Sequence, residues 1–114
     1  MGLSLSEYEV KEFEPWELLP APCQAIIAVE CAKESKAAET ISQVSHKETM
    51  LRFETEREVI RLLGADCTVP VGAYSEINGE KISLTVSDGK GHFAQGEKEI
   101  EKRFELVKEL TDKL

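Results

Sequence analysis

The stretch from Gly64 to Val86, GADCTVPVGAYSEINGEKISLTV, decides the fold that we expect for this chain of 114 residues. Two runs rich in β-branched and aromatic residues flank Asn78-Gly79, a dipeptide typical of a tight hairpin turn because both residues tolerate positive φ. Pro70 cannot donate a hydrogen bond to a neighbouring strand, which favours an edge strand or a bulge there. The stretch therefore predicts a β-hairpin with Cys67 at its mouth.

Helical patterns precede this hairpin. Ser45 and Glu48 form an S-x-x-E capping box, which is typical of a helix start, and Gly64 is a plausible end for the same helix. Its apolar residues share one stripe, formed by Met50, Phe53, Ile60 and Leu63 with Val59 and Leu62 beside them. A shorter helix is predicted over residues 35–44.

After the hairpin, a turn at residues 88–91 leads to a third strand over residues 92–97. A last helix then carries five apolar residues on one face, namely Ile100, Phe104, Val107, Leu110 and Leu114. The order from residue 45 onward is α-β-β-β-α. The predicted fold class is therefore α+β, a three-stranded antiparallel sheet covered by helices.

The apolar run CQAIIAVEC, residues 23–31, predicts a buried strand because it is rich in Ile and Val and is bounded by prolines and charged residues. The residues before it supply no neighbouring strand, so we interpret it as the remnant of a sheet whose other strands are missing. Exposed apolar strands pair with other chains. We therefore expect residues 1–35 to be reorganised, packed onto the three-stranded sheet, or engaged in a homodimer through residues 23–31.

Composition narrows the class of partner. The formal net charge is −8, from 22 acidic against 14 basic residues, which disfavours binding to nucleic acid. The longest apolar run is far short of the roughly 20 residues of a membrane span, so no membrane partner is expected. Three cysteines without a C-x-x-C pair indicate reduced thiols and a cytoplasmic protein. The isolated His46 and His92 predict no metal site, because zinc needs clustered ligands.

Three stretches resemble the porphobilinogen deaminase (hydroxymethylbilane synthase) family. LPAPCQAIIAVEC, residues 19–31, is similar to the family segment L-P-A-x-G-Q-G-A-x-x-I-E-C, and HKETMLRFETER, residues 46–57, to its H-x-E-T…E-R helix. CTVPVGAY, residues 67–74, is similar to the cofactor-loop signature G-G-C-x-V-P-[IL]-[GA]. On these residues the chain is identified as a member of that family.

The resemblance implies a role for Cys67. In the family this cysteine carries a covalent dipyrromethane through a thioether, as the primer on which the linear tetrapyrrole grows. The residues alone leave two interpretations open, a reactive thiol or a small buried side chain at a helix–strand corner. The family Gly-Gly is replaced here by Ala65-Asp66, and a neighbouring carboxylate disfavours the thiolate.

Other residues match the family without implying chemistry. Gln24 matches the glutamine at the interdomain seam, or is a residue bonded to backbone. Cys31 is expected in the core, and Cys23 stands where the motif has glycine before Gln24. Glu56 and Arg57 are interpreted as part of a capped helix with surface ion pairs.

The resemblance also implies the domain organisation. Residues 1–35 are expected to be a remnant of the second domain with the interdomain hinge, and residues 36–114 the C-terminal, cofactor-anchoring domain. The family's acid–base aspartate and substrate-binding cations belong to its first two domains. We therefore expect no catalytic residue and no activity in this chain alone, with the missing N-terminal domains and the porphobilinogen-derived pyrrole chain as partners. The alternatives are a degenerate, non-catalytic interaction module that keeps the deaminase fold, and an unrelated α+β binding domain.

Overall fold

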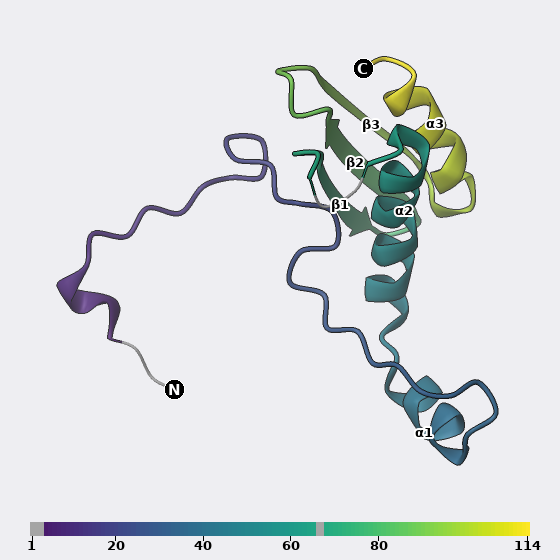
Figure 1. Cartoon of the computed structure of the whole chain (residues 1–114). Helices are drawn as coiled ribbons and strands as arrows, with labels where there is room; N and C mark the ends of the chain where they lie inside the picture. The colour runs from purple at the N-terminus through teal and green to yellow at the C-terminus, as the bar shows by residue number, and fades with distance from the viewer. Residues whose placement is uncertain (1–3, 66–67) are drawn as a thin grey trace.

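The computed structural model describes residues 4–65 and 68–114. Within them, one three-stranded sheet is preceded and followed by helices (Figure 1). The elements are η1 (Leu5–Glu7), α1 (Lys36–Val44), α2 (Lys47–Leu63), β1 (Gly72–Asn78), β2 (Lys81–Ser87), β3 (Phe93–Glu99), η2 (Ile100–Lys102) and α3 (Arg103–Thr111). The predicted α+β class and the order α-β-β-β-α are confirmed, with the short 3-10 helix η2 inserted before the last α-helix.

The sheet is antiparallel throughout, in the order β1-β2-β3. Asn78 pairs with Lys81, which leaves Gly79 and Glu80 as the two-residue loop of the predicted hairpin. Gly79 has a φ of 64° whereas Glu80 has no positive φ, the pattern of a type II′ turn. β1 lies at an edge of the sheet and Pro70 stands just ahead of it, so the proline interrupts no ladder.

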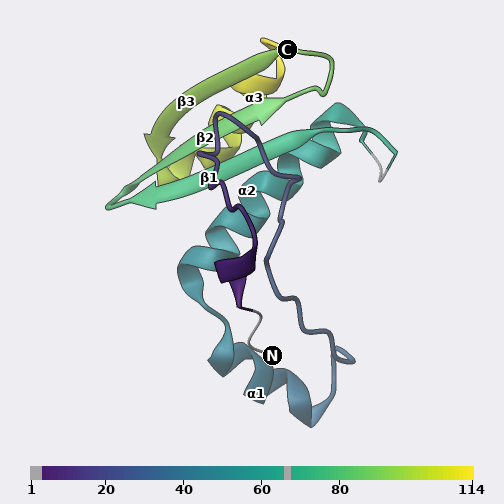
Figure 2. The same ribbon diagram turned by 90° about the vertical axis from the view of Figure 1, so that its left-hand side faces the viewer.

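The core lies between the sheet and the helices α2 and α3, which cover the same face of it (Figures 1 and 2). Alternate residues of β2 point into this core, and Ile82, Leu84 and Val86 are each at most 1% exposed. Val107 of α3 is fully buried, as predicted. Phe104 instead lies at the rim, with the guanidinium carbon of Arg103 4.4 Å from its ring centre.

The helix α2 begins with a different cap from the one predicted. Ser45 ends α1, and His46 is the residue that caps α2, because its Nδ1 accepts a hydrogen bond from the backbone N–H of Thr49 at 3.3 Å. The capping box of Ser45 and Glu48 is therefore wrong. Only Ser45 and His46 separate the two helices. At the other end Gly64, with a φ of 60°, terminates α2 as predicted.

The predicted strand over residues 23–31 does not form. Cys23 and Ala25 have φ values of 62° and 66°, and left-handed residues turn the backbone out of the extended conformation. The described part of the chain offers this run no neighbouring strand for its backbone groups. Ile27 is consequently 91% exposed instead of buried.

Within the N-terminal region, residues around 15–23 pack on the sheet face opposite α2 and α3 (Figure 2). The carbonyl oxygen of Pro20 accepts a hydrogen bond from the N–H of Ala73 at 3.1 Å. Leu19 lies against Gly72, and Trp16 borders a shallow cavity shared with Phe93. Packing onto the sheet was one of three outcomes expected for residues 1–35, and it is found around residues 15–23.

The described residues include no helix that is long and apolar enough to cross a membrane. α2 has 17 residues, and charged side chains recur along its whole length.

Candidate functional site

The loop between α2 and β1 carries Cys67, which with Asp66 lies outside the described residues. The residues that enter this loop are held by the end of α2. The N–H of Ala65 donates to the carbonyl of Ile60 at 3.1 Å, and Ala65 packs against the core. The entrance of the loop is therefore fixed to the helix.

The exit of the loop is held by a contact between Pro70 and Gly89. The backbone of Gly89 comes so close that a Cβ at this position would lie 2.2 Å from the carbonyl oxygen of Pro70. Val71, the next residue, is 8% exposed and belongs to the core. Both ends of the loop are thus anchored, while Val69 between them is 41% exposed.

The turn that supports Pro70 is braced by Asp88. Its Oδ1 accepts hydrogen bonds from the N–H groups of Lys90 at 2.8 Å and His92 at 3.2 Å, and its Oδ2 lies 2.6 Å from the Nδ1 of His92. The bond to the His92 ring, followed by the Lys90 amide, lowers the pKa of Asp88 to about 2. The ionised carboxylate therefore holds the turn at neutral pH.

Glu56 of α2 is a buried carboxylate, only 3% exposed. Its Oε1 accepts from the N–H of Ser75 at 2.9 Å and from the Ser75 Oγ at 2.6 Å, and its Oε2 accepts from the N–H of Cys23 at 2.7 Å. The Nη2 of Arg52 lies 3.9 Å from Oε1. The interpretation of Glu56 as part of a surface ion pair is therefore wrong, because its main partners are β1 and the N-terminal segment.

The apolar stripe predicted for α2 did not point to Glu56, because that stripe is not the buried face of the helix. Met50 is 44% exposed, whereas the buried residues of α2 are Thr55, Glu56 and Val59. Arg57, the neighbour of Glu56, is exposed and lies over the Phe53 ring, with 5.7 Å between its guanidinium carbon and the ring centre.

Cys23 has a half-buried thiol that is poorly suited to covalent chemistry. Burial, with a smaller contribution from the nearby Glu56 carboxylate, raises the pKa of Cys23, although Arg57 acts in the opposite direction. The thiolate is the nucleophilic form of cysteine. Cys23 is therefore mostly protonated at neutral pH, and its sulfur lies 3.7 Å from the carbonyl oxygen of Phe53.

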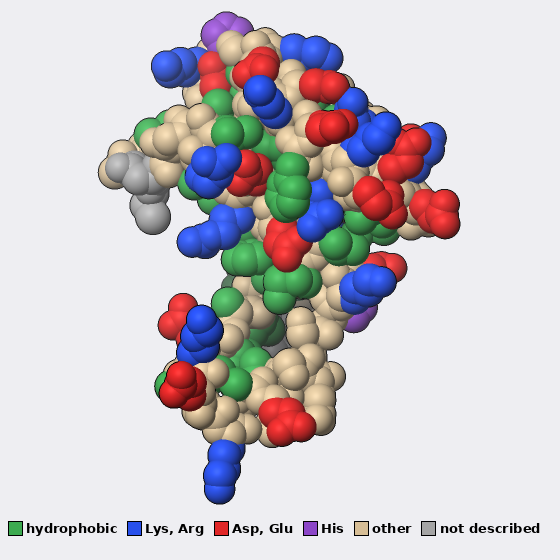
Figure 3. All heavy atoms as spheres, turned by 90° about the vertical axis from the view of Figure 1, so that its right-hand side faces the viewer, with side chains coloured by type: hydrophobic (Ala, Val, Ile, Leu, Met, Phe, Trp, Pro, Cys, Tyr) green, Lys and Arg blue, Asp and Glu red, His purple; other side chains and the backbone are tan. Residues whose placement is uncertain are grey.

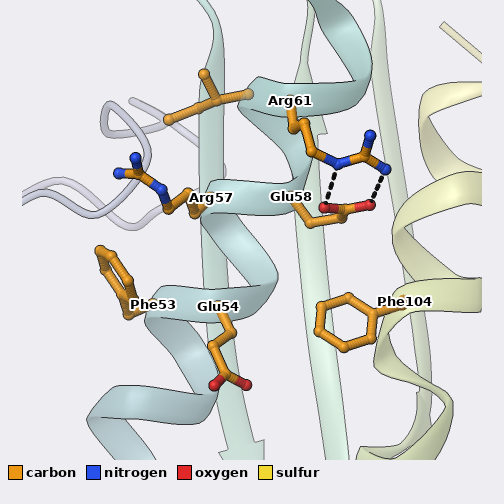
Figure 4. Close-up of a pocket in the computed structure, with 7 residues that line it drawn as sticks. Phe53, Glu54, Arg57, Glu58, Arg61 and Phe104 are labelled. Atoms are coloured by element: carbon orange, nitrogen blue, oxygen red, sulfur yellow. Dashed lines mark hydrogen bonds and ion pairs between the residues drawn. The ribbon is translucent and has the colours of Figure 1, made fainter.

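A shallow pocket lies between α2 and α3 (Figure 4). Arg61 donates two hydrogen bonds to Glu58, one of them 2.7 Å from Nε to Oε2, which lowers the pKa of Glu58. Glu54 accepts from the Nη2 of Arg103, also at 2.7 Å. The residues that line the pocket carry two carboxylates, Glu54 and Glu58, and two guanidinium groups, Arg57 and Arg61, so the lining itself brings no surplus positive charge to an acidic ligand.

The wider surface around this pocket has the same character. Figure 3 shows acidic and basic side chains interspersed over the helical face, with apolar side chains between them. Residues 4–65 and 68–114 also contain no group of three or more His, Cys, Asp or Glu side chains placed to bind a metal ion.

Comparison with known proteins decides the family. The sequence model of "Porphobilinogen deaminase, C-terminal domain" matches residues 50–114, which include α2 from its fourth residue on, the Cys67 loop, the sheet and α3. The chain belongs to this family. The resemblance read from the sequence is thereby confirmed, and the interpretation as an unrelated α+β binding domain is excluded.

Curated porphobilinogen deaminases align with most of the chain. The protein from Clostridium kluyveri is 38% identical over 100 residues, or 88% of this chain and 33% of the relative. The protein from Desulforamulus reducens is 37% identical over 112 residues, or 92% of this chain and 36% of the relative. The chain thus spans about a third of the length of these deaminases.

Two further residues that matched the deaminase motif are placed by the structure. The side-chain Oε1 of Gln24 accepts a hydrogen bond from the N–H of Ala21 at 3.2 Å, so it is bonded to backbone, although not within a strand. Cys31 is exposed, so its predicted place in the core is wrong, because the strand that was to bury it is absent.

Proposed function

We propose that this chain is the C-terminal domain of a porphobilinogen deaminase in tetrapyrrole biosynthesis, and that Cys67 holds a dipyrromethane cofactor through a thioether. The observation that carries the proposal is the family match over residues 50–114. This match contains Cys67-Thr68-Val69-Pro70, which follows the family's cofactor-loop signature at the junction of α2 and β1.

The described surroundings of the loop suit a covalent anchor. Its entrance is held by Ala65 and its exit by Pro70 and Val71, so a group attached between them would be tethered between two anchored residues. The Cys67 thiol would lose its proton, and its sulfur would bond to the methylene carbon of a porphobilinogen-derived pyrrole as the bond from that carbon to nitrogen breaks and ammonia is released. When bound, the dipyrromethane supplies the primer to which porphobilinogen units add.

The remaining steps of the reaction are proposed to need other domains. The pyrrole chain carries several carboxylates, and a module with a net charge of −8 does not attract such a substrate. The pocket between α2 and α3 does not change this balance. We therefore expect no tetrapyrrole absorbance when the chain alone is mixed with porphobilinogen.

The anchoring role can be tested by co-expressing the chain with the N-terminal two thirds of the Clostridium kluyveri deaminase. We expect the intact mass of the chain to rise by one dipyrromethane. The increase should be absent in Cys67→Ser and retained in Cys31→Ser, which removes an exposed thiol. The relative's own C-terminal third, expressed in the same way, is the positive control. An unmodified chain beside a loaded control would refute the anchoring role.

A second candidate function is a non-catalytic interaction module with the deaminase fold. The observation that favours it is Ala65-Asp66 in place of the family's two glycines. In general, a carboxylate beside a cysteine disfavours the thiolate, which is the form that would bind the cofactor. The double variant Ala65→Gly/Asp66→Gly distinguishes the two. Loading that occurs only in this variant would support the module and exclude the anchor in the natural sequence.

A further inference from the structure

The carboxylate of Glu56 joins three parts of the molecule. It projects from α2, accepts two hydrogen bonds from Ser75 of β1, and accepts one from the backbone of Cys23 in the N-terminal segment. A carboxylate accepts all three bonds. A glutamine of the same size cannot, because its amide nitrogen only donates, and would meet the N–H of Cys23 with another donor.

The burial of this charge calls for a specific reason. A buried carboxylate is unfavourable unless it is well hydrogen-bonded or paired. Arg52 offers only a distant contact, at 3.9 Å, and its side chain is 37% exposed. The short bonds to Cys23 and Ser75 are therefore the interactions that compensate Glu56 for the loss of water.

The segment that Glu56 holds lies directly beside the start of β1. Leu19 packs on Gly72, and the carbonyl oxygen of Pro20 accepts from the N–H of Ala73. These contacts fall on the first two residues of β1, immediately after the loop that carries Cys67. The N-terminal segment and the exit of the loop are thus held by the same part of the strand.

We propose that Glu56 is a positioning residue, which fastens residues 19–23 to β1. It thereby fixes the position of the exit of the Cys67 loop with respect to the part of the chain that precedes residue 19. The effect on cofactor loading rests on the proposed function, whereas the fastening itself does not.

The fastening is tested by hydrogen exchange of the full chain carrying Glu56→Gln. We expect the hydrogen-bonded amides of Ala21, Cys23 and Gln24 to exchange at least tenfold faster, with less than a twofold change in β2. The matched control is Glu58→Gln, on the same helix, whose carboxylate accepts two hydrogen bonds from Arg61 of that helix. Leu19→Ala is the second variant, because it weakens the same docking without touching the buried carboxylate. Unchanged exchange of these amides in Glu56→Gln, or an equal rise throughout the sheet, overturns the proposal, while faster exchange in Leu19→Ala shows that loss of the docking is detected.

The positioning effect is tested in the co-expression experiment. We expect Glu56→Gln to reduce the loaded fraction of the chain at least fivefold, while Glu58→Gln loads normally. Normal loading of Glu56→Gln despite fast exchange would overturn the link to the loop. If the natural sequence itself stays unloaded, the proposed function fails, and the exchange measurement still decides whether Glu56 fastens the segment.

Discussion

Replacement of Gly89 by alanine tests whether the exit of the Cys67 loop is held as the structure indicates. Gly89 has a φ of 70°, and a Cβ there would lie 2.2 Å from the carbonyl oxygen and 2.7 Å from the Cγ of Pro70. Backbone cannot yield as a flexible side chain can, so either the turn or residues 68–71 must move. Gly79→Ala is the matched control, because Gly79 has a similar φ of 64° and nothing within 4 Å of the added methyl group.

The expected free energies differ by the steric part alone. The positive φ costs an alanine about 1–3 kcal/mol at either position. The overlap with Pro70 adds about 1–3 kcal/mol at Gly89, the range for inserting an atom into a filled space. Gly79→Ala should therefore lower the free energy of unfolding by about 1–3 kcal/mol, and Gly89→Ala by about 2–6 kcal/mol.

Urea unfolding followed by circular dichroism measures both variants. With an m-value of about 1–3 kcal/mol/M, an additional 2 kcal/mol separates their midpoints by about 0.7–2 M. The loss at Gly89 should also be accompanied by faster hydrogen exchange over residues 68–71, which Gly79→Ala leaves unchanged. If the two variants lose the same free energy, Pro70 is not in close contact with the turn, and the reasoning on the loop exit is refuted.

Three further predictions follow from charges and exposure. Because the pKa of Asp88 is lowered to about 2, its bond to His92 stabilises the fold above about pH 4 and is lost as the pH falls toward 2. In urea titrations, the difference in free energy of unfolding between the natural chain and Asp88→Asn should therefore shrink as the pH falls from 4 to 2. A difference that stays constant would contradict this prediction. Iodoacetamide at pH 7.5 should modify the exposed Cys31 before Cys23, whose pKa is raised, as peptide masses would show; the reverse order would count against the burial of Cys23. The proposed homodimer through residues 23–31 should be abolished by Ile27→Glu, and a natural chain that is monomeric by light scattering removes that proposal.

The hairpin and its flanking helices could be predicted because their signals are local. Glycine at Gly79 fixes the turn, and alternating apolar residues fix which face of β2 is buried. Gly64 ends α2 for an equally local reason. The family motif placed Cys67 in the loop between these elements, a placement that needed no knowledge of distant contacts.

The cap of α2 was missed because two residues compete for one position. Ser45 fits the capping-box pattern, but α1 extends to Val44 and Ser45 is its C-terminal cap, while α2 begins only at Lys47. His46 then takes the capping position with Thr49. The capping-box pattern considers one helix at a time, so it does not take account of where the preceding helix ends.

The predictions of a surface ion pair for Glu56 and of a strand over residues 23–31 were wrong for a common reason. The two parts contact each other, through the bond from the Cys23 N–H to Glu56, although they lie far apart in the sequence. The left-handed backbone at Cys23 and Ala25 costs about 1–2 kcal/mol for each residue, and a hydrogen bond to a charged group contributes about 1.5–3 kcal/mol. The bond from Cys23 to Glu56 is thus of the size needed to offset much of that cost. The family's G-Q-G motif indicates positive φ at these two positions, because Cys23 and Ala25 stand where the motif has glycines, the residues suited to positive φ. A motif glycine at both positions indicates a turning segment, which does not fit a continuous strand over residues 23–31.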